Sequence, residues 1–360
     1  MRTSVFPRRY VQGPGVLRQL GPELSKLGKE IFALVDKMVI DQITPFLDSL
    51  APLSVTIRPF TGHCTHKTVE EIAAEALGSH ATVLVAFGGG SVLDVGRSAA
   101  AAASMAFVSA PTVAASDAPC SGISIVYDDN GVMAGRLSLR NPDLVIVDTA
   151  VIVKAPVRFF AAGIGDGLAT WYEADSCRRS HGPTISGTAG TLLAHAAAEL
   201  CRDTILDRGR QAVRDCAAGL ATPDVDAVGE ATVLLSGIGF ESGGLGAAHA
   251  IHNGLTMLPA TARYMHGEKV AFGLLASLFL SPRPDSLRRE LFSFCADVGL
   301  PVRLRDIGCD GADDAALATI AAKACQPGAN IHNEPFPVTE EMVVTALRAA
   351  DLYGAAYRAD

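Results

Sequence analysis

Runs of consecutive apolar residues alternate with helical patterns in the first part of this chain, and they constrain its fold more than any other feature. The apolar runs lie at residues 31–36, 82–87, 106–110 and 144–147, with an alternating strand pattern at 53–59 and a helical pattern at 69–77. Strands that are apolar on both sides are typical of parallel sheets covered on both faces by helices. The sequence therefore predicts an α/β domain with a doubly wound, mostly parallel, Rossmann-like sheet.

The pattern changes near Pro156. Beyond it β-rich runs disappear, and long segments rich in Ala, Leu and Gly continue with helical spacing to the C-terminus. A chain of 360 residues is long enough for two domains of ordinary size. We therefore expect an α/β domain at residues 1–156 and an all-helical domain at residues 157–360.

Charge and cysteine content bear on the partners of the protein. The net charge is −8 without a cluster of Lys or Arg, which argues against nucleic acid and against an anionic membrane as partners. The longest run of small apolar residues, 99–108, is too short to span a bilayer, and the N-terminus lacks an apolar signal core. Eight cysteines without a Cys-x-x-Cys pair suit reduced thiols. We expect a cytoplasmic protein that acts on small molecules.

A glycine-rich turn follows the apolar run at 82–87. Gly88, Gly89 and Gly90 lead through Ser91 into a helical run. Glycines at a strand-to-helix turn let the backbone approach a pyrophosphate, whose charge is stabilised by N–H groups and the helix dipole. The turn differs from the Gly-x-Gly-x-x-Gly fingerprint, since leucine stands at the third glycine position. A tight turn without a ligand is the alternative interpretation.

Asp36 ends the first apolar run and is a candidate ligand of a nucleotide ribose. A carboxylate at this place accepts a hydrogen bond from the ribose 2′-hydroxyl and repels a 2′-phosphate, which favours NAD over NADP. A solvated aspartate at the end of a strand is the alternative.

Three histidines indicate a metal site in the second half of the chain. The run at 243–250 contains mainly Gly and Ala, so a helix there lets a second backbone or a ligand approach closely and presents His249 and His252 on one face. His266 is expected at the start of the next helix. Any one of these histidines alone is more often a hydrogen-bonded core or surface residue, so the metal interpretation depends on a fourth residue elsewhere.

Two aspartates complete the candidate site. Asp166 lies near the expected start of the first long helix, where it is either a carboxylate favoured by the helix dipole or the third metal ligand beside two histidines. Asp117 lies in a segment of hydroxyl-bearing and small residues at 111–127, which suits a loop that lines a cofactor. Its carboxylate can bind a substrate hydroxyl, although the segment by itself could be an ordinary polar loop.

Several segments together resemble the iron-containing alcohol dehydrogenase family, and within it the glycerol dehydrogenases. The resemblance extends in matching order from Tyr10 to Asn333 and is carried by residues 88–94, 116–121, 163–171, 239–244, 248–254 and 266–273. It implies a two-domain, dehydroquinate synthase-like architecture.

The resemblance also implies roles for individual residues. Asp166, His249 and His266 would bind the metal, and the substrate would contact these three residues and Asp117. The implied NAD contacts are Asp36, Gly88, Gly89, Gly90, Ser91, Val92, Thr112, Val113, Ala114, Ala115, Ser121, Ile123 and Tyr127.

Two positions depart from the family pattern. Ser91 and Val92 stand where glycerol dehydrogenases carry Lys-Thr, and the resulting Gly-Gly-Gly-Ser sequence is closer to the form found in the wider family. Thr170 stands where iron-dependent relatives place a further histidine, four residues after the aspartate ligand. A three-ligand zinc site with an open position is therefore favoured over iron, with one Zn²⁺ per subunit.

The resemblance implies an NAD- and zinc-dependent oxidation of glycerol, or of a similar vicinal diol, to the hydroxyketone. Zinc would act as a Lewis acid on the reacting hydroxyl, whose alkoxide donates hydride to NAD. As catalytic residues, Asp117 would hold the neighbouring hydroxyl and His252 would relay the proton, a structural hydrogen bond being the alternative for His252. A homo-oligomer is expected, and the family suggests an octamer.

Parts of this pattern also fit other functions. Within the oxidoreductases, a 2-hydroxy acid, an aminopropanol or a longer polyol could replace glycerol. A lyase of the dehydroquinate synthase type needs basic residues around a substrate phosphate and a glutamate ligand, and the sequence shows neither. A binding protein without catalytic activity is disfavoured because both the cofactor and the metal residues are complete.

Overall fold

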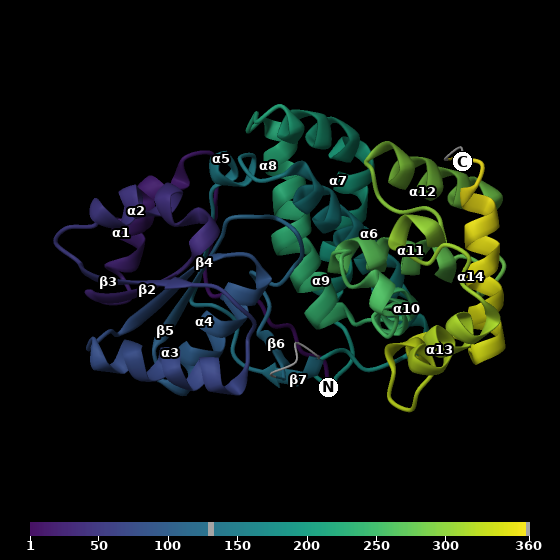
Figure 1. Ribbon diagram of the computed structural model, residues 1–360, viewed down its shortest axis with the longest axis horizontal. Helices are drawn as coiled ribbons and strands as arrows, with labels where there is room; N and C mark the ends of the chain where they lie inside the picture. The colour runs from purple at the N-terminus through teal and green to yellow at the C-terminus, as the bar shows by residue number, and fades with distance from the viewer. Residues whose placement is uncertain (129–132, 358–360) are drawn as a thin grey trace.

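The computed structural model describes residues 1–128 and 133–357 and contains an α/β part followed by a helical part (Figure 1). The central sheet has six strands, and every neighbouring pair in it is parallel. Across the sheet the order is β1 (Tyr10–Gln12), β8 (Leu144–Val147), β5 (Ala106–Pro111), β4 (Val83–Gly88), β2 (Glu30–Asp36) and β3 (Ser54–Phe60). The predicted parallel sheet is confirmed.

Both faces of the sheet are buried, as the continuous apolar runs predict. In β2 the side chains of Ile31, Ala33 and Val35 belong to one core, and those of Phe32 and Leu34 belong to the other. The first core includes residues of α1 (Leu20–Leu24) and α2 (Ile40–Asp48), and the second includes residues of α3 (His66–Gly78) and α4 (Gly90–Ala102). The period of two along a strand sends successive side chains to opposite faces, so an uninterrupted apolar strand supplies both cores.

The strand order creates a switch point between β2 and β4. The chain runs from β2 to β3 at one edge of the sheet and then returns to place β4 on the other side of β2. In open α/β sheets a ligand binds outside the carboxyl ends of the strands at such a point. Asp36 ends β2, and Gly88 ends β4. The two predicted nucleotide contacts therefore lie together at the place where this topology binds ligands.

Three strands lie outside the sequence prediction. β1 is an edge strand of three residues. The segment at 111–127, interpreted as a loop, ends in β6 (Ile123–Tyr127), which pairs antiparallel with β7 (Met133–Ser138) in a separate small sheet. These strands are short or mixed in polarity, so they lack the uninterrupted apolar run that marked the others.

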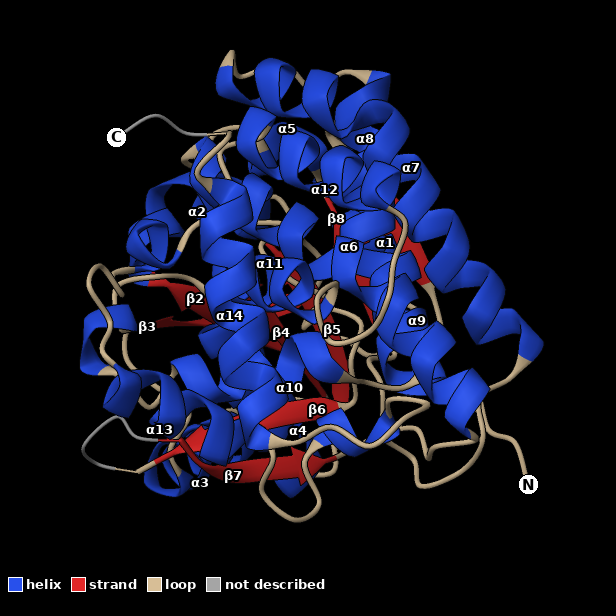
Figure 2. Cartoon of the chain, turned by 90° about the vertical axis from the view of Figure 1, so that its right-hand side faces the viewer, coloured by secondary structure: helices blue, strands red, loops and turns tan. Residues whose placement is uncertain are grey.

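The second half of the described chain is built from helices, and Figure 2 views the molecule from this side, with the strands behind them. The helices are α5 (Thr149–Ile152), α6 (Val157–Ser180), α7 (Leu192–Ala217), α8 (Pro223–Glu230), α9 (Ser236–Gly243), α10 (Ala247–Leu255), α11 (His266–Ser277), α12 (Asp285–Asp297), α13 (Asp314–Ala324) and α14 (Glu340–Gly354). Pro156 is the N-cap of α6, at the expected junction. The division into residues 1–156 and 157–360 stays a prediction.

The single helix expected at 243–250 is wrong. α9 ends at Gly243, Gly244 adopts a φ of 104°, and α10 begins only at Ala247. A backbone with a positive φ cannot continue a right-handed helix, and glycine adopts it without steric cost. The break gives α10 a start of its own, close to His249.

Within the described residues, no helix is both long and apolar enough to cross a membrane. All eight cysteines lie among the described residues and are free thiols, in agreement with the expectation of reduced thiols.

Candidate metal and cofactor site

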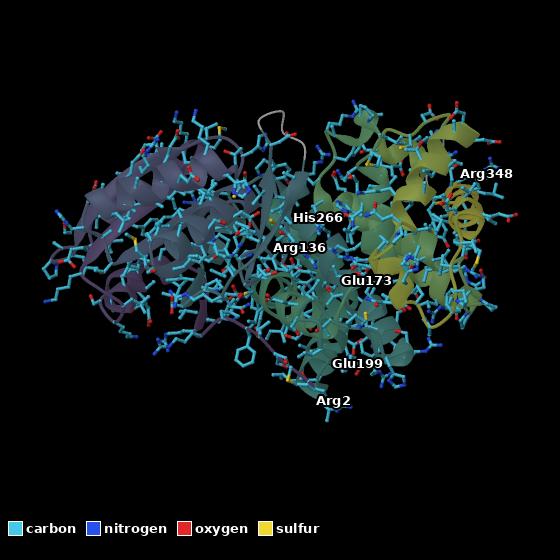
Figure 3. All side chains as sticks on the ribbon, turned by 90° about the horizontal axis from the view of Figure 1, so that it is seen from below. Arg2, Arg136, Glu173, Glu199, His266 and Arg348 are labelled. Carbon is cyan, nitrogen blue, oxygen red and sulfur yellow. The ribbon has the colours of Figure 1, made fainter. Side chains whose placement is uncertain are left out.

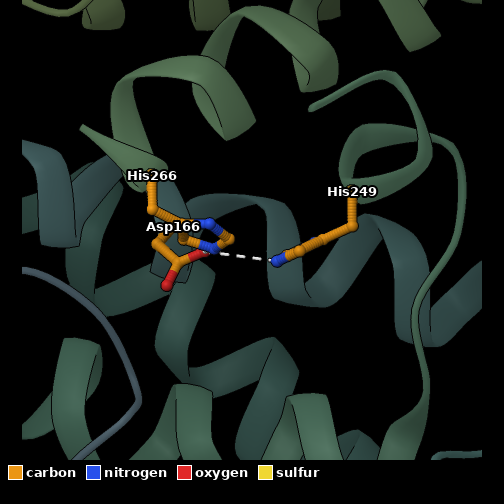
Figure 4. A group of neighbouring side chains, drawn as sticks. All are labelled: Asp166, His249 and His266. Carbon is orange, nitrogen blue, oxygen red and sulfur yellow. Dashed lines mark ion pairs between the residues drawn. The ribbon is translucent and has the colours of Figure 1, made fainter. Parts of the chain in front are cut away.

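Three helices bring Asp166, His249 and His266 together. Asp166 lies in α6, His249 in α10 and His266 at the first position of α11. The ligand atoms of the three residues all lie within 4.8 Å of one another. The Nε2 atoms of His249 and His266 are 3.4 and 3.2 Å from Oδ1 of Asp166, and Figure 4 shows the two rings reaching the carboxylate from different helices. The three predicted metal ligands thus form one possible metal site.

The position of Asp166 decides between its two interpretations. It lies well inside α6, which spans Val157–Ser180, whereas the helix dipole acts mainly within the first turn. The interpretation of Asp166 as a carboxylate at the helix start is therefore wrong. The expectation that His266 begins a helix is confirmed.

The Asp166 carboxylate has the environment of a metal ligand. The side chain is 1% exposed, and neither oxygen has a hydrogen-bond partner with good geometry among the described residues. Burial by itself raises the pKa of Asp166, but His266 and His249 outweigh burial and hold the pKa below its ordinary range. A buried anionic carboxylate without hydrogen bonds is costly unless a cation neutralises it. Two imidazoles and one carboxylate are ligands that suit a divalent transition metal.

The remaining ring nitrogens of the two histidines face protein groups. Nδ1 of His249 is 2.6 Å from Oε2 of Glu173, and Nδ1 of His266 is 3.0 Å from Nε2 of His252. Both Nε2 atoms are thereby left toward Asp166. The three imidazoles converge as predicted, but His252 contacts His266 instead of Asp166.

The pKa values of the two buried histidines, His249 and His252, are shifted in opposite directions. Burial lowers the pKa of His249, but Glu173 and Asp166 outweigh it and raise the pKa well above its ordinary value. Burial together with His266 and His249 lowers the pKa of His252 well below its ordinary value. The lowered pKa favours the neutral form of His252, whose Nε2 can accept a hydrogen bond from Nδ1 of His266.

Glycines allow the ligand-bearing helices to touch through their backbones. A methyl group at Gly267 would lie 1.8 Å from the carbonyl oxygen of Ala162, and one at Gly165 would lie 2.6 Å from that of Gly267. A methyl group at Gly273 would lie 2.4 Å from the carbonyl oxygen of Ala248. The backbone of α11 is therefore in close contact with the backbones of α6 and α10. The distances between the three candidate ligands consequently depend on residues that bind nothing themselves.

Asp117 reaches this site from the α/β part. It is 9% exposed. Burial and the nearby charge of Asp166 raise its pKa well above the ordinary range, and His249 opposes this. The loop at 117–123 therefore brings a carboxylate close enough to Asp166 and His249 to interact with their charges, and sequence reasoning expected a substrate contact at this residue.

Two buried side chains that sequence reasoning missed hold this loop. The guanidinium of Arg97, 1% exposed, donates to the carbonyl oxygens of Ala118 and Ile123. Glu241 of α9 accepts a hydrogen bond from the N–H of Gly122. Arg97 and Glu241 are both distant from this loop in the sequence, so no local sequence pattern indicated these contacts.

The predicted nucleotide contacts gather at the carboxyl ends of the strands. A methyl group at Gly88 would lie 3.1 Å from Cβ of Asp36, and one at Gly89 would lie 3.5 Å from the side chain of Val113. Gly89 precedes the first residue of α4, so the glycine turn opens a helix as expected. Asp36 also caps the following turn by accepting from the N–H of Met38 at 2.9 Å.

The remaining predicted contacts belong to the segments that follow β4 and β5. The Thr112 N–H donates to the Gly88 carbonyl. Ser91 donates to the carbonyl of Gly62, Val92 is buried behind Gly88, and Ser121 accepts from the N–H of Ile123. The ring centroids of Tyr127 and His63 are 5.4 Å apart. Ala115 follows Ala114 in the segment after β5. The side chain of Ala114 is fully buried, and its carbonyl packs on Gly163 of α6.

Comparison with known proteins places these observations in a family. Residues 7–149 match the family model of iron-containing alcohol dehydrogenase. The glycerol dehydrogenase of Thermotoga maritima is 46% identical, over 98% of this chain and 97% of that protein. The glycolaldehyde reductase of Halobacterium salinarum is 41% identical, over 98% of each chain. The crystal structure of a probable glycerol dehydrogenase from Sinorhizobium meliloti 1021 is 37% identical and covers 99% of both chains, with a TM-score of 0.92. The chain belongs to the iron-containing alcohol dehydrogenase family.

Proposed function

We propose that this chain is an NAD-dependent oxidoreductase that oxidises glycerol, or a similar small vicinal diol, to the hydroxyketone. The observation that carries the proposal is that Asp166, His249 and His266 of the helical part form one group, and that buried Asp117 of the α/β part interacts electrostatically with Asp166 and His249. A metal held by three ligands can bind the reacting hydroxyl group of a substrate, and a nearby carboxylate can bind the neighbouring hydroxyl group. The Thermotoga maritima relative is a glycerol dehydrogenase, which supports glycerol as the substrate.

We propose Asp166, His249 and His266 as ligands of one divalent metal, and zinc as that metal. When bound, the metal supplies a Lewis acid that polarises the reacting hydroxyl. Thr170 supports zinc over iron, because a fourth ligand is expected there in iron-dependent relatives. Its hydroxyl instead lies 2.9 Å from that of Ser236, and its methyl packs against Gly239.

The substrate binds between side chains of both parts. A bound divalent cation would offset the repulsion between Asp166 and Asp117 and so favour the anionic form of Asp117. Asp117 then accepts a hydrogen bond from the hydroxyl next to the reacting one, and its negative charge disfavours carboxylate and phosphate groups on the substrate. The side chain of His266 is 43% exposed, whereas that of Asp166 is 1% exposed. The proposed metal site is therefore open to a substrate on the side of His266. Asp36 and the turn at 88–92 bind the ribose and the pyrophosphate of NAD.

The contacts of His252 support a positioning role for this residue. Its two ring nitrogens lie 3.0 Å from His266 and 3.1 Å from Asn253. A proton relay through His252 stays a prediction. A cytoplasmic location and a homo-oligomeric, octameric assembly also stay predictions.

Steady-state oxidation with NAD tests the function. The panel contains glycerol, 1,2-propanediol, 1-propanol, lactate and glycolaldehyde, the last assayed as a reduction with NADH. We expect the two diols to give the highest kcat/KM and NAD to be preferred over NADP. Glycolaldehyde is the second candidate because the Halobacterium salinarum relative is a glycolaldehyde reductase. A preference for lactate or for NADP would contradict the proposal.

Asp117→Ala is expected to lower kcat/KM for glycerol and 1,2-propanediol much more than for 1-propanol. A hydrogen bond to a charged group contributes about 1.5–3 kcal/mol, so the loss for the diols should be about tenfold to a hundredfold. Asp117→Asn, which retains an acceptor oxygen, serves as the matched control and should lose less. Equal losses for diols and monoalcohol in Asp117→Ala would mean that Asp117 shapes the loop instead of contacting the substrate.

A further inference from the structure

Glu173 is a buried carboxylate that contacts a candidate ligand, His249, without being a candidate ligand itself. It lies in α6 seven positions after Asp166, which places both residues on the same face of the helix. The side chain is 2% exposed, and Figure 3 labels it inside the helical part, whereas Glu199 lies at the periphery. A buried carboxylate persists only with several strong partners.

The partners of Glu173 all belong to the start of α10. Oε1 accepts hydrogen bonds from the backbone N–H groups of Gly246 and His249, at 2.9 and 2.8 Å. Oε2 lies 2.6 Å from Nδ1 of His249. One carboxylate thus binds both the backbone and the ring of the same candidate ligand.

Glu334 provides a natural comparison at the same helix start. Its Oε1 accepts from the N–H of Ala247 at 3.0 Å, and its Oε2 accepts from the hydroxyl of Ser176 at 2.8 Å. The N-cap residue Gly246 has no side chain, so the two glutamates replace the usual capping side chain. Both carboxylates cap α10, but only Glu173 contacts the imidazole of His249.

The contact with Glu173 determines which nitrogen of His249 is protonated. A carboxylate only accepts hydrogen bonds, so Nδ1 of His249 carries the proton when the ring is neutral. The lone pair of Nε2 then points toward Asp166, 3.4 Å away. A carboxylate behind a ligating histidine in this way fixes the tautomer and the ring orientation and raises the basicity of the ligand.

We propose that Glu173 is a positioning residue that holds His249 in the tautomer and orientation needed to bind the metal. The inference rests on the proposed metal site. A neutral glutamine at this place would have one acceptor oxygen for three converging donors, the N–H groups of Gly246 and His249 and the Nδ1–H of His249. At least one donor would lose its partner, or the amide would face Nδ1 and move the imidazole proton to Nε2. Either outcome weakens the metal site.

Zinc binding to the metal-free protein tests this proposal without reference to activity. The variants are Glu173→Gln and, as matched control, Glu334→Gln, and the affinity is measured by competition with a chromophoric chelator. Changes to groups behind metal ligands cost about tenfold to a hundredfold in affinity. We expect a loss of this size in Glu173→Gln and less than a threefold change in Glu334→Gln, while thermal unfolding of the metal-free proteins shows a similar destabilisation in both.

The outcomes separate the positioning role from helix capping and from the proposed function. Equal losses of zinc affinity in both variants, or wild-type affinity in Glu173→Gln, would overturn the positioning role. Absence of zinc binding in the wild-type protein would instead overturn the metal site itself. Should Glu173→Gln not fold, Glu173→Asp withdraws the carboxylate while keeping its charge, and it is expected to weaken zinc binding relative to Glu334→Asp.

Discussion

Asp166→Asn is expected to abolish nearly all activity while leaving the fold in place. Asparagine has the shape of aspartate but lacks the charge that attracts a cation and holds two imidazoles nearby. Lewis-acid stabilisation is worth several kcal/mol and each 1.36 kcal/mol is tenfold in rate, so kcat/KM for glycerol should fall by at least about a thousandfold. Elemental analysis should find about one zinc per chain in the wild-type protein and far less in the variant.

Exposed Asp207 provides the control, because it pairs only loosely with Arg208 on the surface of α7. Asp207→Asn should retain both zinc and activity. Asp166→Asn should also lose the stabilisation that added zinc gives to the wild-type protein in thermal unfolding, since a ligand stabilises only the state that binds it. Full zinc occupancy in Asp166→Asn would contradict the ligand set. Less than half an equivalent of zinc in the wild-type protein, with activity restored by stoichiometric iron, would contradict the choice of metal.

Gly267→Ala is expected to have the second large effect, although this residue binds no ligand. Its new methyl group would lie 1.8 Å from the carbonyl oxygen of Ala162 and 2.6 Å from the carbonyl carbon, closer than the 3.0 Å below which real Cβ atoms are essentially never found. Both obstacles are backbone atoms, so α6 and α11 must separate. Overpacking costs about 1–3 kcal/mol and occasionally more, and we expect at least the upper end of this range.

The same separation would move His266 away from Asp166 and weaken zinc binding. Urea denaturation of the metal-free proteins measures the loss of stability, and chelator competition measures the affinity for zinc. Gly78→Ala is the matched control, since Gly78 ends α3 and a methyl group there meets nothing within 4 Å. It should be neutral or stabilising by up to about 1 kcal/mol. Wild-type stability and affinity in Gly267→Ala would show that the two backbones separate without cost.

The sequence was most informative where the physical cause is local. Continuous apolar runs such as 82–87 predicted buried parallel strands, because burial on both faces excludes polar residues from either side. Glycines after this strand predicted the turn into α4, and the polar turn before His266 predicted a helix start there. Each of these features depends on residues within a few positions of one another.

The boundaries of helices were predicted less well than their presence. The composition at 243–250 indicated a helix, but the positive φ of Gly244 divides it, and glycine composition alone does not report φ. Asp166 was expected near a helix start and lies well inside α6, since the start of that helix is set by Pro156. In both cases the residue types were informative and the boundaries were not.

The sequence by itself determined the classes of structure and the chemistry of the candidate site. Its apolar periodicity gave a parallel sheet followed by helices, and its residues, together with the family resemblance, indicated Asp166, His249 and His266 as ligands and Asp117 beside them. Only the tertiary structure showed that Glu173 lies behind His249, that Arg97 and Glu241 hold the loop of Asp117, and that Gly267 sets the spacing of two helices. The physical reason is sequence separation. Glu173 and His249 are 76 positions apart, and Glu241 and Gly122 are 119 apart. Contacts of this kind leave no periodic trace in the chain, because they exist only after packing has brought distant helices and loops together.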